Sequence, residues 1–149
     1  MANQVVHFEI SGTDPGRLRS YYRDLFGWTY ELGDTVSGQV SEPGQYGFVG
    51  NAGVNGGVGG GPSLRAKVLF YVGVDDVGTA LARAEELGGV RVFGPEGVPG
   101  KLVVAQFTDP EGNLMGLAGE RYRRGGRGRT DARMGACTCD RRLRPTSRS

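Results

Sequence analysis

The stretch Asp109-Pro110-Glu111-Gly112-Asn113-Leu114-Met115-Gly116-Leu117 decides how this chain is expected to fold. Its first half carries turn chemistry: Asp can open a type I turn, Pro fixes the following φ, and Gly tolerates the positive φ that closes a hairpin. Strand-like sequences flank the turn, Leu102–Phe107 before it and Leu114–Ala118 after it. The stretch therefore predicts a β-hairpin at the end of an ordered domain.

The residues before this hairpin predict a strand, a helix and another strand. Val68–Val74 is a strand candidate, and Asp75-Asp76 opens a helix that Gly88-Gly89 ends. The apolar stripe of that helix consists of Val77, Ala80, Leu81, Ala84 and Leu87. Val90–Phe93 is the next strand candidate.

The first half of the chain repeats this order. Val5–Ile10 is a strand candidate, Asp14-Pro15 starts a helix and Gly27 stops it. The helix has an apolar stripe of Leu18, Tyr21, Tyr22, Leu25 and Phe26, and the strand candidates after it are Trp28–Leu32, Tyr46–Val49 and, weakly, Val54–Val58. Each half thus has the order β-α-β-β-β, which predicts an α+β protein of two modules, about 4–60 and 66–119. One unit alone would leave a sheet face bare, so the two should pack together or form a shared barrel.

The segment Gly53–Gly61 has six glycines in nine residues. We interpret it as a flexible connector between the modules. The alternative is that part of it is a strand, in which glycine lets another backbone or a ligand approach closely. It is not a phosphate loop, because neither a Lys-Ser/Thr pair nor a helix start follows.

Charge divides the chain into two segments. Residues 1–120 have 8 Lys or Arg against 14 Asp or Glu, a net charge of −6, whereas residues 121–149 have 10 Arg against 2 Asp, a net charge of +8. We therefore expect one domain over 1–120 and a basic, disordered tail over 121–149, which has too few apolar residues to fold. No apolar run is long enough for a membrane helix, and the N-terminus lacks signal-peptide features, so a soluble cytoplasmic protein is expected.

The tail suggests alternatives of its own. Arg123–Arg129 looks like the Arg/Gly segments that bind nucleic acid by charge, but it contains no aromatic residue, so we do not expect nucleic acid as a partner and keep it only as an alternative. Cys137 and Cys139 form a lone C-x-C without a second pair, which does not predict a zinc site. A shifted reading frame through GC-rich DNA would also give this composition.

Several segments together resemble the vicinal oxygen chelate superfamily, which includes glyoxalases, bleomycin resistance proteins and extradiol dioxygenases. The segments that carry the resemblance are His7, Asp14-Pro15, Tyr21-Tyr22-Arg23-Asp24-Leu25-Phe26-Gly27-Trp28, Val72-Gly73-Val74-Asp75-Asp76-Val77, Leu87-Gly88-Gly89 and Asp109-Pro110-Glu111-Gly112-Asn113. The resemblance covers about residues 4–119. It implies that each module curls into a half-barrel, so that the two form a curved mixed sheet, and that a homodimer is a fair expectation.

The resemblance also implies a divalent metal held by up to four side chains, but this chain matches the ligand pattern poorly. His7 is the only matching ligand position. The equivalent position in the second module is Leu69, or Val68 after a one-residue slip, and Gly116 stands where the last-strand carboxylate belongs. Because transition-metal sites need three or four ligands, we expect no cofactor, with a divalent metal at His7 and Glu9 as the alternative.

The candidate catalytic residues are His7 and Glu9, which lie two apart on one strand and so face the same way. His7 is a candidate acid or base, or else a strand residue with a satisfied hydrogen bond. Glu9 is a candidate general base with a pKa raised by burial, or else an exposed, solvated glutamate at the barrel mouth. The candidate ligand-binding residues are the strand aromatics Tyr46, Phe48 and Tyr71, and the polar Gln106, whose side chain needs a ligand or backbone partner. For Trp28 we expect packing between helix and sheet.

These residues support several functions. The first is binding of a small metabolite or antibiotic, with aromatic molecules as one class, in a pocket without the usual metal. The second is a lyase or isomerase that moves a proton with His7 or Glu9. A metal-dependent dioxygenase or glyoxalase is the third, and nucleic-acid association through the tail is the fourth.

Overall fold

The computed structural model describes residues 2–122, so the predictions made for the tail beyond Tyr122 lie outside the described residues. The first module consists of β1 (Val5–Gly12), α1 (Pro15–Phe26), β2 (Tyr30–Gly33), β3 (Tyr46–Val49) and β4 (Gly56–Gly60). The second consists of β5 (Lys67–Gly73), α2 (Val77–Glu86), β6 (Val90–Gly97), β7 (Val103–Thr108) and β8 (Leu114–Gly119). The predicted α+β fold with two βαβββ modules is confirmed.

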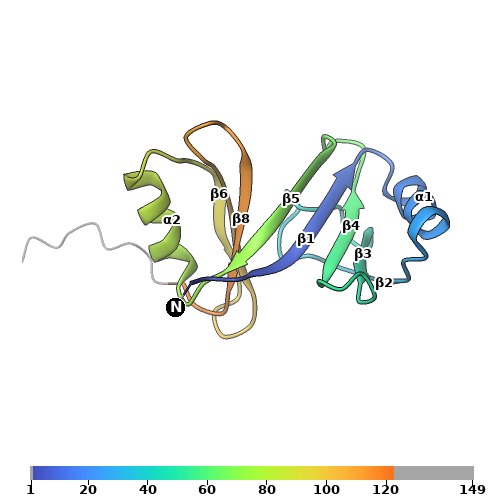
Figure 1. Ribbon diagram of the computed structural model, residues 1–149, viewed down its shortest axis with the longest axis horizontal. Helices are drawn as coiled ribbons and strands as arrows, with labels where there is room; N and C mark the ends of the chain where they lie inside the picture. The colour runs from blue at the N-terminus through green and yellow to red at the C-terminus, as the bar shows by residue number, and fades with distance from the viewer. Residues whose placement is uncertain (1, 123–149) are drawn as a thin grey trace, which may run out of the picture.

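All eight strands belong to one curved mixed sheet with the order β2-β3-β4-β1-β5-β8-β7-β6. The modules meet where β1 and β5 pair antiparallel, with His7 opposite Tyr71 and Glu9 opposite Leu69. Each of these two strands also pairs with the last strand of its own module. In the first module β4 runs parallel to β1, and in the second β8 runs parallel to β5. Figure 1 shows α1 and α2 at opposite ends of the molecule, with β1 and β5 in the middle.

The helices begin where the sequence predicted. The Asp14 side chain accepts a hydrogen bond from the backbone N–H of Arg17 and so caps α1, and the left-handed Gly27 ends that helix. Asp76 caps α2 in the same way through the N–H of Thr79. Local capping therefore fixes the start of each helix after its strand.

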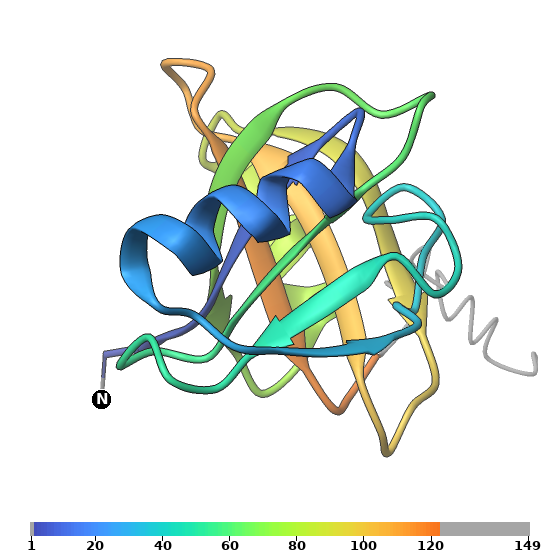
Figure 2. The same ribbon diagram turned by 90° about the vertical axis from the view of Figure 1, so that its right-hand side faces the viewer.

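The apolar stripe of α1 is less buried than its pattern predicted. Tyr21, Leu25 and Phe26 are exposed, although the helix lies across the strands of its own module (Figure 2). Trp28 packs between helix and sheet, as predicted, with ring centroids 5.4 Å from Tyr22 and 5.1 Å from Phe8.

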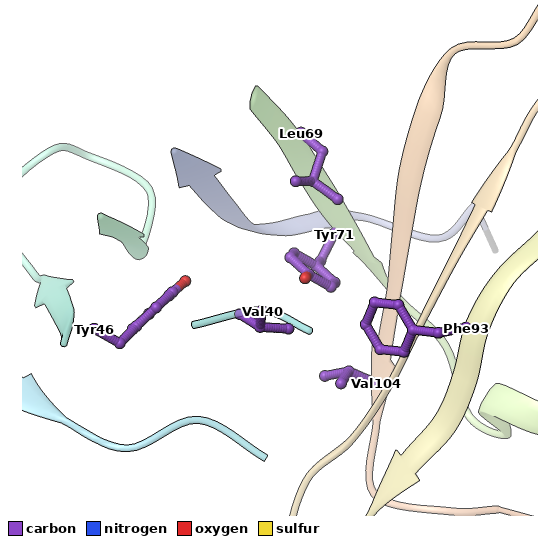
Figure 3. Close-up of a cluster of buried hydrophobic side chains, with 6 residues drawn as sticks. All are labelled: Val40, Tyr46, Leu69, Tyr71, Phe93 and Val104. Atoms are coloured by element: carbon purple, nitrogen blue, oxygen red, sulfur yellow. The ribbon is translucent and has the colours of Figure 1, made fainter. Parts of the chain in front are cut away.

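Buried apolar side chains form two clusters. One holds α2 against β7 and β8, and consists of Val77, Leu81, Val103, Ala105 and Leu117. The other lies on the inner face of the sheet and includes residues from both modules: Val40, Tyr46, Leu69, Tyr71, Phe93 and Val104 (Figure 3). This second cluster joins the modules and forms one side of the cavity described below.

The interpretation of Gly53–Gly61 as a flexible connector between the modules is wrong. The glycine-rich segment forms β4, a fully buried strand that pairs with both β1 and β3. Its glycines leave room for aromatic rings on both faces: a side chain at Gly56 would overlap the ring of Phe8, and one at Gly57 would overlap the ring of Tyr46. The alternative of a strand that permits close approach is therefore correct.

The predicted hairpin turn joins β7 to β8. The Asp109 carboxylate accepts hydrogen bonds from the backbone N–H groups of Glu111 and Asn113 and from the Asn113 side chain. Gly112 has a φ of +87°, the positive value expected of it. These hydrogen bonds hold the pKa of Asp109 below its ordinary value.

No helix between residues 2 and 122 is long and apolar enough to span a membrane.

Candidate functional site

A half-open cavity of about 260 Å³ lies on the inner face of the sheet. Five of the six predicted site residues line it: His7, Glu9, Tyr46, Phe48 and Tyr71. They come from β1, β3 and β5, three strands that the sheet order brings close together. Side chains two apart on a strand share a face, which explains why β1 and β3 each contribute a pair.

Glu9 lies at the base of this cavity and only 1% of its surface is exposed. Three hydroxyl contacts satisfy its carboxylate: Tyr71 Oη lies 3.2 Å from both Oε1 and Oε2, and Tyr46 Oη lies 3.3 Å from Oε1. The alternative of an exposed, solvated glutamate is wrong, because the Tyr46 and Tyr71 side chains lie against its carboxylate.

Gln106 is buried, with 0% of its surface exposed, and is not among the residues that line the cavity. Its Nε2 donates to Tyr71 Oη at 2.8 Å, so its partner is neither the backbone nor the cavity itself. The Gln106 Oε1 atom is buried without a hydrogen-bond partner. Gln106 therefore acts on the site only through Tyr71, whose hydroxyl it orients toward Glu9.

His7 completes a hydrogen-bonded chain that runs His7–Tyr46–Glu9–Tyr71–Gln106. His7 Nε2 lies 2.8 Å from Tyr46 Oη. While Tyr46 donates its proton to Glu9, its oxygen accepts from the Nε2–H of His7, which leaves Nδ1 of His7 as an acceptor. Burial lowers the pKa of His7, so the ring is neutral at neutral pH.

Burial also determines the protonation of Glu9, Tyr46 and Tyr71, the other titratable groups in this series of hydrogen bonds. It raises the pKa of Glu9 to about 7, with the charge of Lys67 and the two tyrosine hydroxyls acting in the opposite direction. Burial and the neighbouring Glu9 charge raise the pKa of Tyr46 and Tyr71 above the ordinary value, so both remain protonated donors. The cavity thus contains one carboxyl group that changes charge near neutral pH.

Part of the cavity was not predicted from the sequence, namely the part formed by the loop between β2 and β3 and by the second module. The loop contributes Asp34, Thr35, Val36 and Val40, and the second module contributes Leu102, Val104 and Ala118. The loop carries no motif, and the apolar residues look like ordinary core, so no local signal could have identified them. Asn55, in the glycine-rich segment just before β4, also lines the cavity.

Comparison with known proteins agrees with this architecture. The family model described as a glyoxalase-like domain matches residues 7–118, which is most of the chain. The chain belongs to this glyoxalase-like family. No curated protein matches it.

Several solved structures share the glyoxalase-like fold. A hypothetical protein from Bacillus halodurans C-125 has a TM-score of 0.60 and 15% identity over 83% of this chain and 98% of its own. A methylmalonyl-CoA epimerase in complex with methylmalonyl-CoA has a TM-score of 0.58 and 13% identity, over 80% of this chain and 96% of its own. The Mycobacterium tuberculosis methylmalonyl-CoA epimerase has a TM-score of 0.55 and 13% identity, over 77% and 86%. At these identities the likeness shows the fold alone.

The glyoxalase-like fold raises the question of a divalent metal, and the residues present do not fit one. Within residues 2–122 no group of three His, Cys, Asp or Glu side chains could hold an ion. The register of the sheet explains why: Gly57 lies beside Glu9 in the first module, and Gly116 lies beside Tyr71 in the second. Tyrosine rings fill the space at both positions, since a side chain at Gly57 or Gly116 would overlap Tyr46 or Tyr71.

Proposed function

We propose that this protein binds a small, largely apolar molecule in the cavity and does so without a metal. The observation that carries the proposal is the buried carboxyl of Glu9 between two tyrosine hydroxyls, at the base of an apolar cavity of about 260 Å³. Apolar walls with a few placed polar groups are typical of small-molecule sites. Metabolites and antibiotics with an aromatic ring are one class that such walls would suit.

A thermal-shift screen with small metabolites and aromatic antibiotics tests this proposal, because a ligand that binds only the folded state stabilises it. The screen is run with a chelator present, so that a stabilising compound cannot act through a metal. Ala118→Leu extends a side chain into the cavity and should abolish the shift. Val68→Leu, at an exposed position on the other face of β5, should keep it.

The second candidate function is a lyase or isomerase reaction in which Glu9 removes a proton from carbon. The specific observation in its favour is the raised Glu9 pKa of about 7, near the value that suits a general base at neutral pH. Tyr46 and Tyr71 would stay protonated and orient the carboxylate toward the ligand. His7, hydrogen-bonded to Tyr46, would supply a path for the proton to the cavity.

Deuterium exchange separates binding from catalysis. A compound found in the screen is incubated with the protein in D₂O, and its C–H positions are followed by NMR. Exchange that is lost in Glu9→Gln while binding remains supports the proton-transfer function. Binding without exchange supports the binding function alone.

The described residues do not favour a dioxygenase or a metal-dependent glyoxalase. Within residues 2–122 no third His, Cys, Asp or Glu side chain joins His7 and Glu9 to hold an ion, whereas a metal site needs three or four ligands.

A further inference from the structure

We propose that the cavity prefers a small organic cation, a substituted ammonium group on an apolar body, over neutral and anionic molecules of the same shape. This inference rests on the proposed function, since it names the class of molecule that the cavity would bind. Two independent features carry it, the charge of the cavity wall and the arrangement of aromatic rings around Glu9.

The charged side chains that line the cavity are both acidic. Glu9 lies at the base and Asp34 in the loop that borders the cavity, and none of the described lining residues is Lys or Arg. Lys67 acts on Glu9 by its charge, but it does not line the cavity, and its Nζ donates to the backbone oxygen of Gln39. A ligand anion would therefore meet two carboxylates and no positive partner, whereas a cation would be attracted by both.

Aromatic rings from three strands line the same cavity as this carboxylate. The centroids of Tyr46 and Phe48 lie 4.8 Å apart with the rings inclined by 64°, and His7 lies 6.2 Å from Tyr46 and 5.9 Å from Tyr71. The faces of such rings carry negative electrostatic potential and attract cations, ammonium groups above all. Aromatic faces next to a carboxylate in one cavity are the kind of surroundings in which ammonium groups bind.

The protonation of Glu9 supports the same class of ligand. With a pKa of about 7 the carboxyl is partly protonated at neutral pH in the absence of ligand. A bound cation favours the charged form, so its binding should release a proton and strengthen as the pH rises through 7. A neutral ligand gains nothing from this ionisation.

A matched series of probes tests the preference. Choline, 3,3-dimethylbutanol and 3,3-dimethylbutanoate share a branched body and differ mainly in charge. Each is titrated into the full-length protein, and binding is measured from the NMR signals of Tyr46 and Tyr71. We expect choline to bind at least tenfold more tightly than the alcohol, and the acid to bind most weakly.

Three variants, compared with wild type, show whether the rings and the carboxylate cause the preference. Phe48→Leu removes a cavity ring, and Phe70→Leu removes a ring of similar exposure from the other face of the sheet, 40% against 43%. The choline preference should fall in Phe48→Leu and in Glu9→Gln, and persist in Phe70→Leu and in wild type.

Each other outcome overturns the inference. Equal or tighter binding of the alcohol or the acid shows that the cavity binds small molecules without a preference for cations, which leaves the proposed function standing. A preference unchanged in both Phe48→Leu and Glu9→Gln shows that choline binds elsewhere. If none of the three probes binds, the cation preference is wrong, while the screen with Ala118→Leu still decides the proposed function separately.

Discussion

The ring of Tyr46 lies against the backbone of Gly57, in space that any side chain at that position would occupy. A side chain at Gly59, two residues along the same strand, would also overlap this ring. The glycines of β4 therefore set the position of Tyr46, and Tyr46 in turn contacts both His7 and Glu9. A segment without functional side chains thus determines the geometry of the candidate site.

Substitution of Gly57 should disturb this arrangement. A methyl group in Gly57→Ala would force the Tyr46 ring aside, and overpacking of this kind typically costs about 1–3 kcal/mol of unfolding free energy. Urea unfolding measures the loss. Gly50→Ala is the control, because a side chain at Gly50 meets no atom within 4 Å, and equal loss in both variants would contradict the prediction.

The Glu9 carboxyl should make the protein less stable as the pH rises. The folded protein holds this proton up to about pH 7, whereas an ordinary glutamate loses it near 4.5, so the unfolded chain ionises first. The unfolding free energy contributed by Glu9 is therefore highest below about pH 4.5 and falls, by roughly 3 kcal/mol in total, as the pH rises through 7.

Urea unfolding of wild type and Glu9→Gln over this pH range checks the sign. Glutamine resembles the protonated form of Glu9 at every pH. The difference in unfolding free energy between Glu9→Gln and wild type should therefore shift in favour of the variant by roughly 3 kcal/mol as the pH rises from below 4.5 to above 7. His7 is present in both proteins, so the comparison isolates the titration of Glu9. Parallel stability curves for the two would refute the raised pKa.

The hydroxyl of Tyr71 should matter more for stability than that of Tyr46. Tyr71→Phe leaves Gln106 Nε2 buried without its partner, next to an Oε1 that already lacks one, at a cost of about 1–3 kcal/mol. Tyr46→Phe removes one hydroxyl from Glu9 Oε1, but that atom keeps its contact with Tyr71, so only the half-buried His7 loses its partner altogether. In the double variant Tyr71→Phe with Gln106→Leu, part of the loss should be recovered, and strictly additive losses in this cycle would argue against the pairing.

Metal removal should leave the protein unchanged. Because no group of three His, Cys, Asp or Glu side chains within residues 2–122 could hold an ion, dialysis against a strong chelator should not alter the thermal unfolding temperature, and titration with Zn²⁺ or Mn²⁺ should give no tight, stoichiometric binding. Calorimetry measures both. An ion bound one to one, and lost in His7→Ala, would refute the proposal that the site works without a metal.

The sequence predicted the fold because its strongest local signals agree with the tertiary structure. Asp14 and Asp76 cap their helices, and Asp109 closes its hairpin, through contacts within a few residues. Such contacts depend on the local sequence alone, so they can be inferred without knowing what lies nearby. Successive side chains of a strand point to opposite faces of the sheet, so the shared face of His7 and Glu9 can also be inferred from the local sequence.

The predictions that failed depend on long-range packing. Glycine disfavours strands, so β4 looked like a connector, and only the rings of Phe8 and Tyr46 explain its composition. The burial of Glu9 and the partner of Gln106 depend on Tyr71, which is distant from both in the chain. Periodicity places Tyr21 on an apolar helix face, yet it does not say whether that face is covered.

The tight fit of glycine against tyrosine has a consequence for how such a protein can change. A chelating acid at position 57 or 116 and the ring beside it would compete for one volume, so no single substitution can install the acid while the ring remains. Conversion would require a paired exchange in each half of the molecule, a smaller residue for the ring together with the new carboxylate. Engineering or evolution toward an ion-dependent descendant would therefore pass through intermediates that are overpacked where the acid comes first and underpacked where the ring is replaced first.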